Sequence, residues 1–409
     1  MQEGAPWRSG FAADYERIFV EPWSPYVGAI LLVVVVLGLM ISGLFWGVFG
    51  GLKLWGDWFN TAIGLGGVLN INAELESPLL HRMSLMDITL LMGALAAALM
   101  SRQFRLSQPP KLEYVWGALG GTLMGIGATL AGGCTTGGFF TPALHSSPAA
   151  WMMALGLLAG AAIGLKLLFW TLENISWGMQ APAAGAPGSR TLYPLFGILV
   201  IAAIVIWSFA WSQAAEAKLA SRAIIVIAGF AIGFIMQRSR LCFARGFREP
   251  FMTAEGDMTK ALLLALAIAM PLALLLFQNK VIDPYIAIPP TFWAGSLLGG
   301  VIFGMGMIFA GGCASGSLWR AAEGNLKLWV ALAFFAWSGS TFSGILRQWE
   351  IMTHDIDLNG LEFTKLGVQA YLPDMLGGWG WALAAGFSLL LLWYLLVRYN
   401  ESTEQFTIL

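Results

Sequence analysis

The chain has 409 residues, of which 58% are hydrophobic and 11% are charged, and its net charge is −1. Soluble proteins carry about 25% charged residues, so this composition excludes an ordinary soluble domain. The neutral balance also gives no electrostatic footprint for nucleic acid. We therefore predict an all-α polytopic membrane protein with about ten or more transmembrane or re-entrant helices.

The predicted elements begin with a segment at residues 1–24, followed by the clearest spanning helix at residues 25–48. Residues 51–72 are amphipathic, and we expect them to lie along the membrane interface. The other predicted spans are residues 84–101, 115–134, 149–172, 192–212, 221–237, 258–277, 292–313, 327–346 and 376–397. Several of these segments are rich in Gly and Ala, so some are expected to be broken or re-entrant.

A Pro/Gly/Ala-rich linker, GMQAPAAGAPGSR, at residues 178–190 is the natural boundary between two halves. The first membrane half covers residues 25–177, and the second covers residues 191–398. A C-terminal tail follows at residues 399–409. Each half is long enough for several spans of about 20 residues.

A glycine-dense apolar segment that ends in Gly-Gly-Cys occurs once in each half. The two copies are GGTLMGIGATLAGGCTTG at residues 120–137 and GGVIFGMGMIFAGGCASG at residues 299–316. The shift that takes Cys134 to Cys313 also takes Gly132 and Gly133 to Gly311 and Gly312. Such self-similarity at a fixed offset is an internal repeat, so the two halves are predicted to be related.

Lys and Arg residues form two clusters that set the predicted orientation. They are Arg102, Arg105 and Lys111 in one cluster, and Arg238, Arg240, Arg245, Arg248 and Lys260 in the other. If both clusters are cytoplasmic, both termini are cytoplasmic and the acidic segment at residues 347–375 lies outside. The two repeat copies then cross in opposite directions, as in inverted pseudo-symmetric halves. We expect them to bring Cys134 and Cys313 towards a shared centre.

The Gly-Gly-Cys motif has a functional and a structural interpretation. If a helix breaks there, the bare backbone amides of Gly132, Gly133, Gly311 and Gly312 can hold an anion within the membrane. A thiol is a weak, polarizable donor that suits a soft partner such as sulfur. Alternatively, the glycines only allow close helix packing, and cysteine is a small buried residue.

The third cysteine, Cys242, lies in the arginine-rich segment QRSRLCFARGFR at residues 237–248. Cations such as Arg240 attract anions and activate a thiol, so this segment is a candidate anion funnel. The alternative is that the arginines set the topology and bind lipid phosphate. The sequence contains no nucleotide-binding motif and no metal-ligand spacing, so we predict no cofactor, no metal and no catalytic cluster.

Together, the duplicated G-G-C-x-x-G and the R-S-R-L-C-F element resemble the YeeE/YedE family of sulfur-transport membrane proteins, with the YedE-type members most similar. The resemblance covers residues from about 80 to 395. It implies a narrow central route along which Cys134, Cys242 and Cys313 pass thiosulfate by transient S–H hydrogen bonds. In the thiosulfate importers of this family the Cys-Phe element lies in the first half, whereas here it lies in the second. The direction of transport therefore stays open.

We predict a transporter of the inner (plasma) membrane that takes up a small sulfur-containing anion, with thiosulfate as the leading candidate. The resemblance also implies a link to selenium compounds and a TusA-like cytoplasmic sulfurtransferase as a partner. Two further alternatives are a membrane sulfurtransferase that carries a persulfide on Cys242 and a structural subunit without a substrate. The other expected partner is the lipid bilayer itself.

Overall fold

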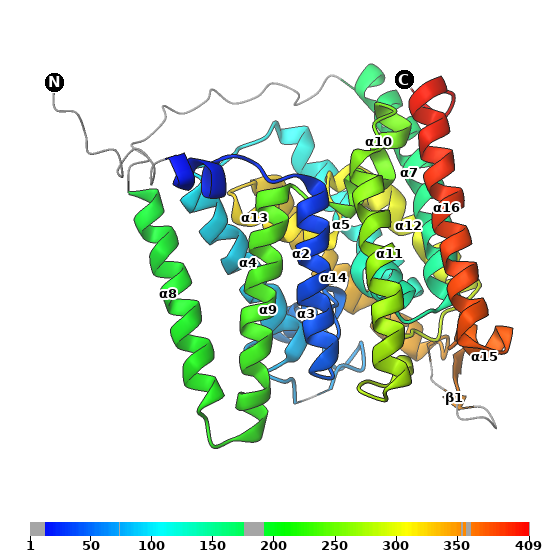
Figure 1. Ribbon diagram of the computed structural model, residues 1–409, viewed down its shortest axis with the longest axis horizontal. Coiled ribbons are helices and arrows are strands. Elements are labelled where there is room, and N and C mark those ends of the chain that lie inside the picture. The colour runs from blue at the N-terminus through cyan, green and yellow to red at the C-terminus, as the bar shows by residue number, and fades with distance from the viewer. Residues whose placement is uncertain (1–12, 73, 176–191, 353–354, 357–360, 409) are drawn as a thin grey trace.

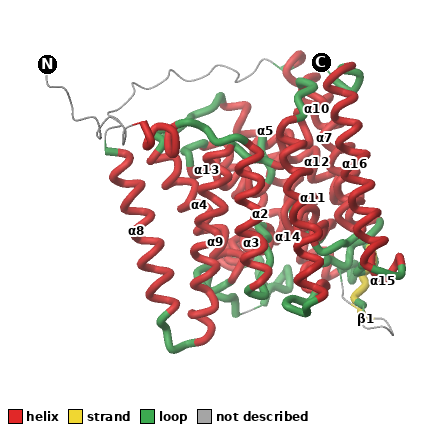
Figure 2. The backbone as a smooth tube through the Cα atoms, viewed as in Figure 1, coloured by secondary structure: helices red, strands yellow, loops and turns green. Residues whose placement is uncertain are grey.

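The computed structural model describes residues 13–72, 74–175, 192–352, 355–356 and 361–408, and these form a bundle of helices (Figures 1 and 2). Among the described residues, nine helices are long and apolar enough to cross a membrane, or up to ten if one bent pair counts as a span. The predicted all-α membrane architecture is thereby confirmed. The predicted linker at residues 178–190 lies outside the described residues.

The elements follow in chain order. They are η1 (Glu16–Val20), α2 (Pro25–Ile41), α3 (Phe49–Ala62), α4 (Arg82–Met100), α5 (Lys111–Ala131), η2 (Thr135–Phe140), α6 (Thr141–Leu144), α7 (Pro148–Asn174), α8 (Tyr193–Ser212), α9 (Ala217–Ser239), α10 (Phe243–Met252), α11 (Asp257–Gln278), η3 (Pro284–Ala287), α12 (Ala294–Ala310), α13 (Ala314–Ala322), α14 (Leu326–Gln348), β1 (Asp355–Ile356), β2 (Glu362–Thr364), β3 (Gly367–Val368), α15 (Leu372–Leu376) and α16 (Trp379–Thr403).

Three of the spans are interrupted helices. One runs over Lys111–Leu144, one over Ala217–Met252 and one over Ala294–Ala322. Their breaks separate α5 from η2 and α6, α9 from α10, and α12 from α13. The predicted spans 115–134, 221–237 and 292–313 end at or just before these breaks. The half-helices that continue each span were not predicted, because their glycine, arginine and serine content conceals their helical pattern.

The glycines of the repeat bring α5 and α12 into close contact. A methyl group built on Gly127 would lie 2.5 Å from the Phe303 nitrogen, and one built on Gly120 would overlap Ala310. Because residue numbers rise along α5 as they fall along α12, the two helices are antiparallel. Small residues also allow α5 to pack along α14 and α12 to pack along α7. For example, Gly121 of α5 lies against Ala331 of α14.

This antiparallel pairing places the two Gly-Gly-Cys motifs at opposite ends of the α5–α12 pair. The nitrogen of Ala131, which ends α5, lies 2.6 Å from a methyl built on Gly299 near the start of α12. The stretch of α5 from Gly120 to Ala131 spans roughly 16 Å at the α-helical rise. Cys134 and Cys313 therefore follow opposite ends of the contact between α5 and α12, and a shared centre for both stays a prediction.

Helix α3 differs from the interfacial segment predicted at residues 51–72. It is shorter and packs against α4 and α14, and its Asp57 and Asn60 are buried. Ser340 on α14 donates a hydrogen bond of 2.6 Å to Asp57, and Lys53 forms an ion pair of 2.7 Å with the same carboxylate. The polar residues that suggested an interfacial helix are used for contacts inside the protein.

The acidic segment at residues 347–375 contains the only strands in the described part of the chain. The strands β1, β2 and β3 form a small antiparallel sheet, in which Phe363 pairs with Val368. This sheet and α15 lie at the opposite end of the bundle from α10 and the end of α16 (Figure 1). Sequence periodicity did not predict strands of two or three residues, because such a short pattern is ambiguous.

Two glycine substitutions test whether close packing stabilises the bundle. In Gly93→Ala the added methyl would overlap the Phe230 carbonyl between α4 and α9, so the free energy of unfolding should fall by about 1–3 kcal/mol. Gly38 in α2 has no atom within 4 Å of the same position, so Gly38→Ala should be neutral or stabilise by up to about 1 kcal/mol. Thermal unfolding in detergent measures both, and equal effects would contradict this account.

Candidate functional site

Each of the three cysteines lies at the break of an interrupted span. Cys134 precedes η2, Cys242 precedes α10 and Cys313 precedes α13, and each occupies the N-cap position of the following half-helix. All three are free thiols and almost completely buried. The sequence identified the cysteines, and the structure adds that they occupy one common backbone position.

The residue two positions before each cysteine ends the preceding helix. It has a left-handed backbone in all three spans, with φ of 74° at Gly132, 54° at Arg240 and 85° at Gly311. Glycine adopts this conformation without strain, whereas arginine rarely does. The R-L-C sequence is therefore a third version of the G-G-C break, a relation that was not predicted because the two motifs share only the cysteine.

The thiols lie at the positive ends of half-helices. The first amide groups of a helix have no partner within it and carry a partial positive charge. At α13 one of these is used by the cysteine itself, because the Gly316 N–H donates to Cys313 Sγ at 3.3 Å. Ser315 Oγ lies 3.6 Å from the same sulfur. A thiol in this position is held by weak polar contacts, and an anion beside it would be stabilised.

Cys242 and Cys313 are brought together at Gly316. A methyl built on Gly316 would lie 2.7 Å from Cys242 Sγ and 3.1 Å from Cys313 Sγ. The glycine therefore provides the space into which both sulfur atoms project. This pair joins two spans whose cysteines are 71 residues apart in the sequence.

Cys134 lies apart from this pair. Its sulfur is 3.0 Å from Thr136 Oγ1, in a contact in which either group can donate. The equivalent of Gly316 in the first repeat is Gly137, and a methyl built there would meet only the Gly47 Cα, at 3.8 Å. The neighbouring hydroxyl of Thr135 is buried without a hydrogen-bond partner among the described residues. A buried polar group of this kind marks a place where a polar guest would be stabilised.

A cavity of about 220 Å³ opens beside Cys242, and we call it the arginine cavity. It is lined by Arg240, Cys242, Arg245, Arg248, Trp319 and Arg320. Two of its arginines have carboxylate partners, since Arg240 pairs with Glu323 at 2.7 Å and Arg245 pairs with Glu249 at 2.5 Å. Among the described residues, no carboxylate pairs with Arg248 or Arg320. The cavity therefore keeps a positive charge.

Arg240, the arginine predicted to bind substrate, also holds the cavity wall together. Its guanidinium lies 5.5 Å from the Trp319 ring and donates to Gln103. Burial raises the pKa of its partner Glu323 above the usual value, although Arg240 opposes that rise. Arg320 closes the break before Cys313, because it donates to the Gly311 carbonyl at 2.6 Å.

A second cavity, of about 200 Å³, lies at the first Gly-Gly-Cys motif, and we call it the glycine-lined cavity. Its walls include Phe45, Met83, Gly132, Gly133 and Gly137. Arg82 lies 4.5 Å from the Phe45 ring and places a cation beside this wall. Arg82 was not predicted as a site residue, because it stands alone in the sequence, outside the arginine clusters.

The break after α2 has the same form as the break at Cys242 but has no thiol. Gly43 has φ of 71°, and the Leu44 amide donates to the Leu39 carbonyl as the Leu241 amide does to Met236. The sequences Ser-Gly-Leu-Phe-Trp at residues 42–46 and Ser-Arg-Leu-Cys-Phe at residues 239–243 align at this turn. Phe45 therefore stands where Cys242 stands in the other half.

Three aromatic rings pack together between the breaks, and we call them the aromatic cluster. Trp46, Phe140 and Phe243 have ring centroids 5.5–6.1 Å apart, and all are fully buried. Phe140 follows Cys134 within η2, and Phe243 directly follows Cys242. The cluster therefore links the separate Cys134 break to the Cys242 break. Its indole N–H, on Trp46, is buried and has no hydrogen-bond partner among the described residues.

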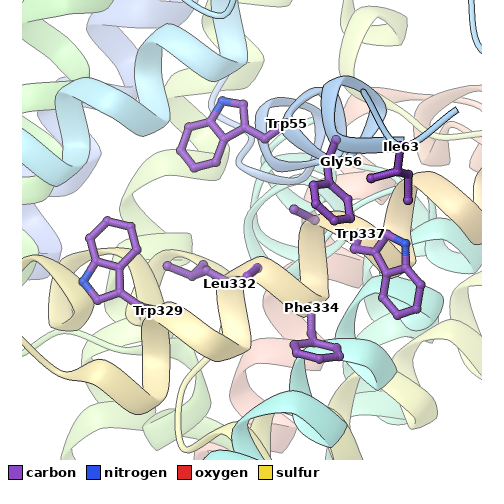
Figure 3. A pocket seen from close by; sticks show the side chains of 10 residues that line it. Trp55, Gly56, Ile63, Trp329, Leu332, Phe334 and Trp337 are labelled. Carbon is purple, nitrogen blue, oxygen red and sulfur yellow. The ribbon is translucent and has the colours of Figure 1, made fainter. Parts of the chain in front are cut away.

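A further cavity, of about 660 Å³, is an apolar groove between α3 and α14 (Figure 3). Trp55, Trp329 and Trp337 contribute to its lining. It contains no thiol and no charged side chain, so it is not a candidate anion site. Its apolar lining suits the hydrocarbon region of a bilayer. No group of described His, Cys, Asp and Glu residues could hold a metal ion.

Comparisons with known proteins give a family model and several relatives of this chain. A family model described as "Sulphur transport" matches residues 3–163 and 238–408. The chain is 28% identical over 302 residues to the probable transporter YedE of Escherichia coli, which covers 71% of this chain and 73% of that protein. It is 38% identical over 107 residues to the thiosulfate transporter TsuA of Escherichia coli, which covers 26% of this chain and 30% of TsuA. The TsuA of Spirochaeta thermophila is 34% identical over 125 residues, 30% of this chain and 37% of that protein.

The cavities predict different reactivities for the thiols. An anionic methanethiosulfonate reagent should modify Cys242 faster than Cys134, by about tenfold, because only Cys242 lines a cavity with a positive charge. A cationic reagent of the same size is the control and should lose this preference. Peptide mass spectrometry of the purified protein measures the rates, and faster labelling of Cys134 would contradict the described geometry.

Proposed function

Since this chain belongs to the sulphur transport family, we propose that it carries a small sulfur-containing anion, with thiosulfate as the best-supported substrate, past its three cysteine thiols. It is a multi-pass membrane transport protein. The observation that supports the proposed chemistry most directly is the convergence of Cys242 and Cys313 on Gly316 beside the arginine cavity.

Thiosulfate has two chemically different ends, and both find suitable partners here. Its terminal sulfur is soft and accepts weak hydrogen bonds from thiols. Its oxygens carry charge that guanidinium groups and half-helix amides stabilise. At Cys242 the thiol pair and the unpaired charge of Arg248 and Arg320 lie together. Two relatives named thiosulfate transporters support the same substrate.

The proposed route begins at the glycine-lined cavity and passes Cys134, the aromatic cluster and the Cys313–Cys242 pair before it reaches the arginine cavity. Weak sites in succession allow both entry and release, because no single site holds the ion strongly. The glycine amides of Gly132, Gly133, Gly311 and Gly312 would offset the charge at the two Gly-Gly-Cys breaks. The unpartnered N–H of Trp46 would donate to an oxygen in the middle of the route.

We propose that the protein lies in the inner membrane with the arginine cavity on the cytoplasmic side, because clusters of arginine favour that side. The end of α16 lies at the same end of the bundle as α10 (Figure 1), which supports a cytoplasmic C-terminus. Helices α5 and α12 are antiparallel. Helix α14 runs parallel to α5, and α7 runs parallel to α12 in the equivalent place. This arrangement supports two inverted halves. On this orientation the anion travels inward.

The family resemblance gives two further predictions. A selenium compound as the substrate and a TusA-like protein as the sulfur acceptor stay predictions. Because the family and the relatives are named as transporters, transport replaces the alternative of a sulfurtransferase. Uptake assays with labelled thiosulfate, sulfite and selenite would rank the three anions directly.

Removal of each thiol tests the proposed relay. Cys134→Ala, Cys242→Ala and Cys313→Ala should each lower thiosulfate uptake about tenfold or more, because one hydrogen bond worth about 1.4 kcal/mol corresponds to a factor of ten. Uptake of labelled thiosulfate into cells, normalised to inserted protein, measures the effect. Unchanged thermal stability in detergent is the control, and normal uptake in all three variants would end the proposal.

A matched pair of glycine substitutions tests the passage without removing a thiol. In Gly316→Ala the methyl would lie within 3.1 Å of both sulfur atoms, so uptake should be lost. In Gly38→Ala the methyl would meet no atom within 4 Å, and Gly38 lies outside the proposed route, so uptake should remain close to that of the parent protein. Equal uptake by the two variants would show that the space beside Gly316 is not part of the route.

A further inference from the structure

One buried carboxyl group takes no part in the route described so far. Asp87 lies in α4, and its side chain is completely buried. Neither of its oxygen atoms has a hydrogen-bond partner among the described residues. An ionised carboxylate at such a site would lose its hydration without compensation. The carboxyl group is therefore stable there only with a proton bound.

The packing of α3 creates this environment. A methyl built on Gly51 would overlap Asp87 Oδ2 and would lie 2.7 Å from the Ser84 backbone. The bare glycine backbone therefore covers the carboxyl group and leaves no room for a second side chain. Asp87 was not singled out in the sequence, although a lone acidic residue within a predicted span was a visible signal.

The charged groups near the N-terminal end of α4 have partners other than Asp87. Those pairings are Lys53 with Asp57 at 2.7 Å, Lys218 with Glu76 at 2.6 Å, Arg222 with the Leu80 carbonyl at 3.0 Å, and Arg82 over the Phe45 ring. Burial lowers the pKa of His81, and its Nδ1 accepts a hydrogen bond from the Ser84 amide, so it is neutral. Helix α8 has no charged residue. The charged groups of η1 and α13 lie at the other end of α4, where Tyr15 donates to Met100.

Asp87 lies directly behind the wall of the glycine-lined cavity. Met83, one helical turn before Asp87, and Gly50, next to Gly51, both line that cavity. For Asp87 to exchange a proton with the cavity, the Met83 side chain would have to move aside. A proton could then enter or leave Asp87 from the same side on which the anion enters.

We propose that Asp87 is the proton-binding residue that couples movement of the anion to movement of protons. The inference rests on the proposed transport function and extends it, since no coupling site has been assigned. A proton bound on Asp87 when the anion occupies the route and released to the other side afterwards would let a pH gradient drive accumulation. Binding and release of one proton on one carboxyl group need no other reactant.

The test uses the full-length protein in vesicles and labelled thiosulfate. Two processes are measured, accumulation driven by an imposed pH gradient and exchange across the membrane without a gradient. Asp87→Asn should keep exchange and lose gradient-driven accumulation, which falls to the level without a gradient. Asp87→Glu should restore part of the accumulation, whereas a merely structural role would be served better by the isosteric Asn. Thr89→Val, at a buried polar residue of the same helix, is the matched control and should behave as the parent protein does.

Accumulation by Asp87→Asn equal to that of the parent protein would overturn the coupling role while leaving transport intact. Absence of exchange of thiosulfate, sulfite and selenite by the parent protein would instead overturn the proposed function. Infrared spectroscopy decides the state of Asp87 independently of transport. The carbonyl band of a protonated carboxylic acid should be present at neutral pH and absent in Asp87→Asn, and an unchanged spectrum would refute proton binding.

Discussion

A helix that breaks inside a bilayer must find new partners for the backbone groups that the break exposes, because hydrocarbon offers none. Side chains supply them here. Arg320 donates to the carbonyl of Gly311, Trp319 donates to that of Leu241 at 3.2 Å, and Thr291 donates to that of Ala131 at 3.0 Å. Each break is therefore bonded to a neighbouring segment, and the cysteines are held where three interrupted spans meet the rest of the bundle.

The duplicated glycines serve two separate structural purposes. Within α5 and α12 they allow the helices to touch, as at Gly127 and Phe303. At Gly132 and Gly311 they end the helices with a left-handed turn. Arg240 makes the same turn at a cost in strain, and its ion pair with Glu323 and its contact with Trp319 offset that cost.

The membrane class, most spans and the three cysteines could be predicted from the sequence, because hydropathy and repetition are local signals. The meeting of Cys242 with Cys313 could not, since it depends on Gly316, whose role is visible only when two spans are packed together. The equivalence of Phe45 and Cys242 was also hidden, because it lies in backbone dihedral angles rather than in residue type. Asp87 is different, since an acidic side chain within an apolar span is visible in the sequence itself.

The replacement of one thiol by Phe45 makes the energy profile along the proposed route uneven. One end has two adjacent thiols and an excess of arginine, and the other has one thiol beside an aromatic ring. An ion rests longest where its free energy is lowest, so on the proposed route departure from the arginine end would be the slow step of each cycle. The concentration of the anion in the receiving compartment would then set how often the arginine end of the route is unoccupied. Transport would slow as the anion accumulates there, without any separate inhibitory site.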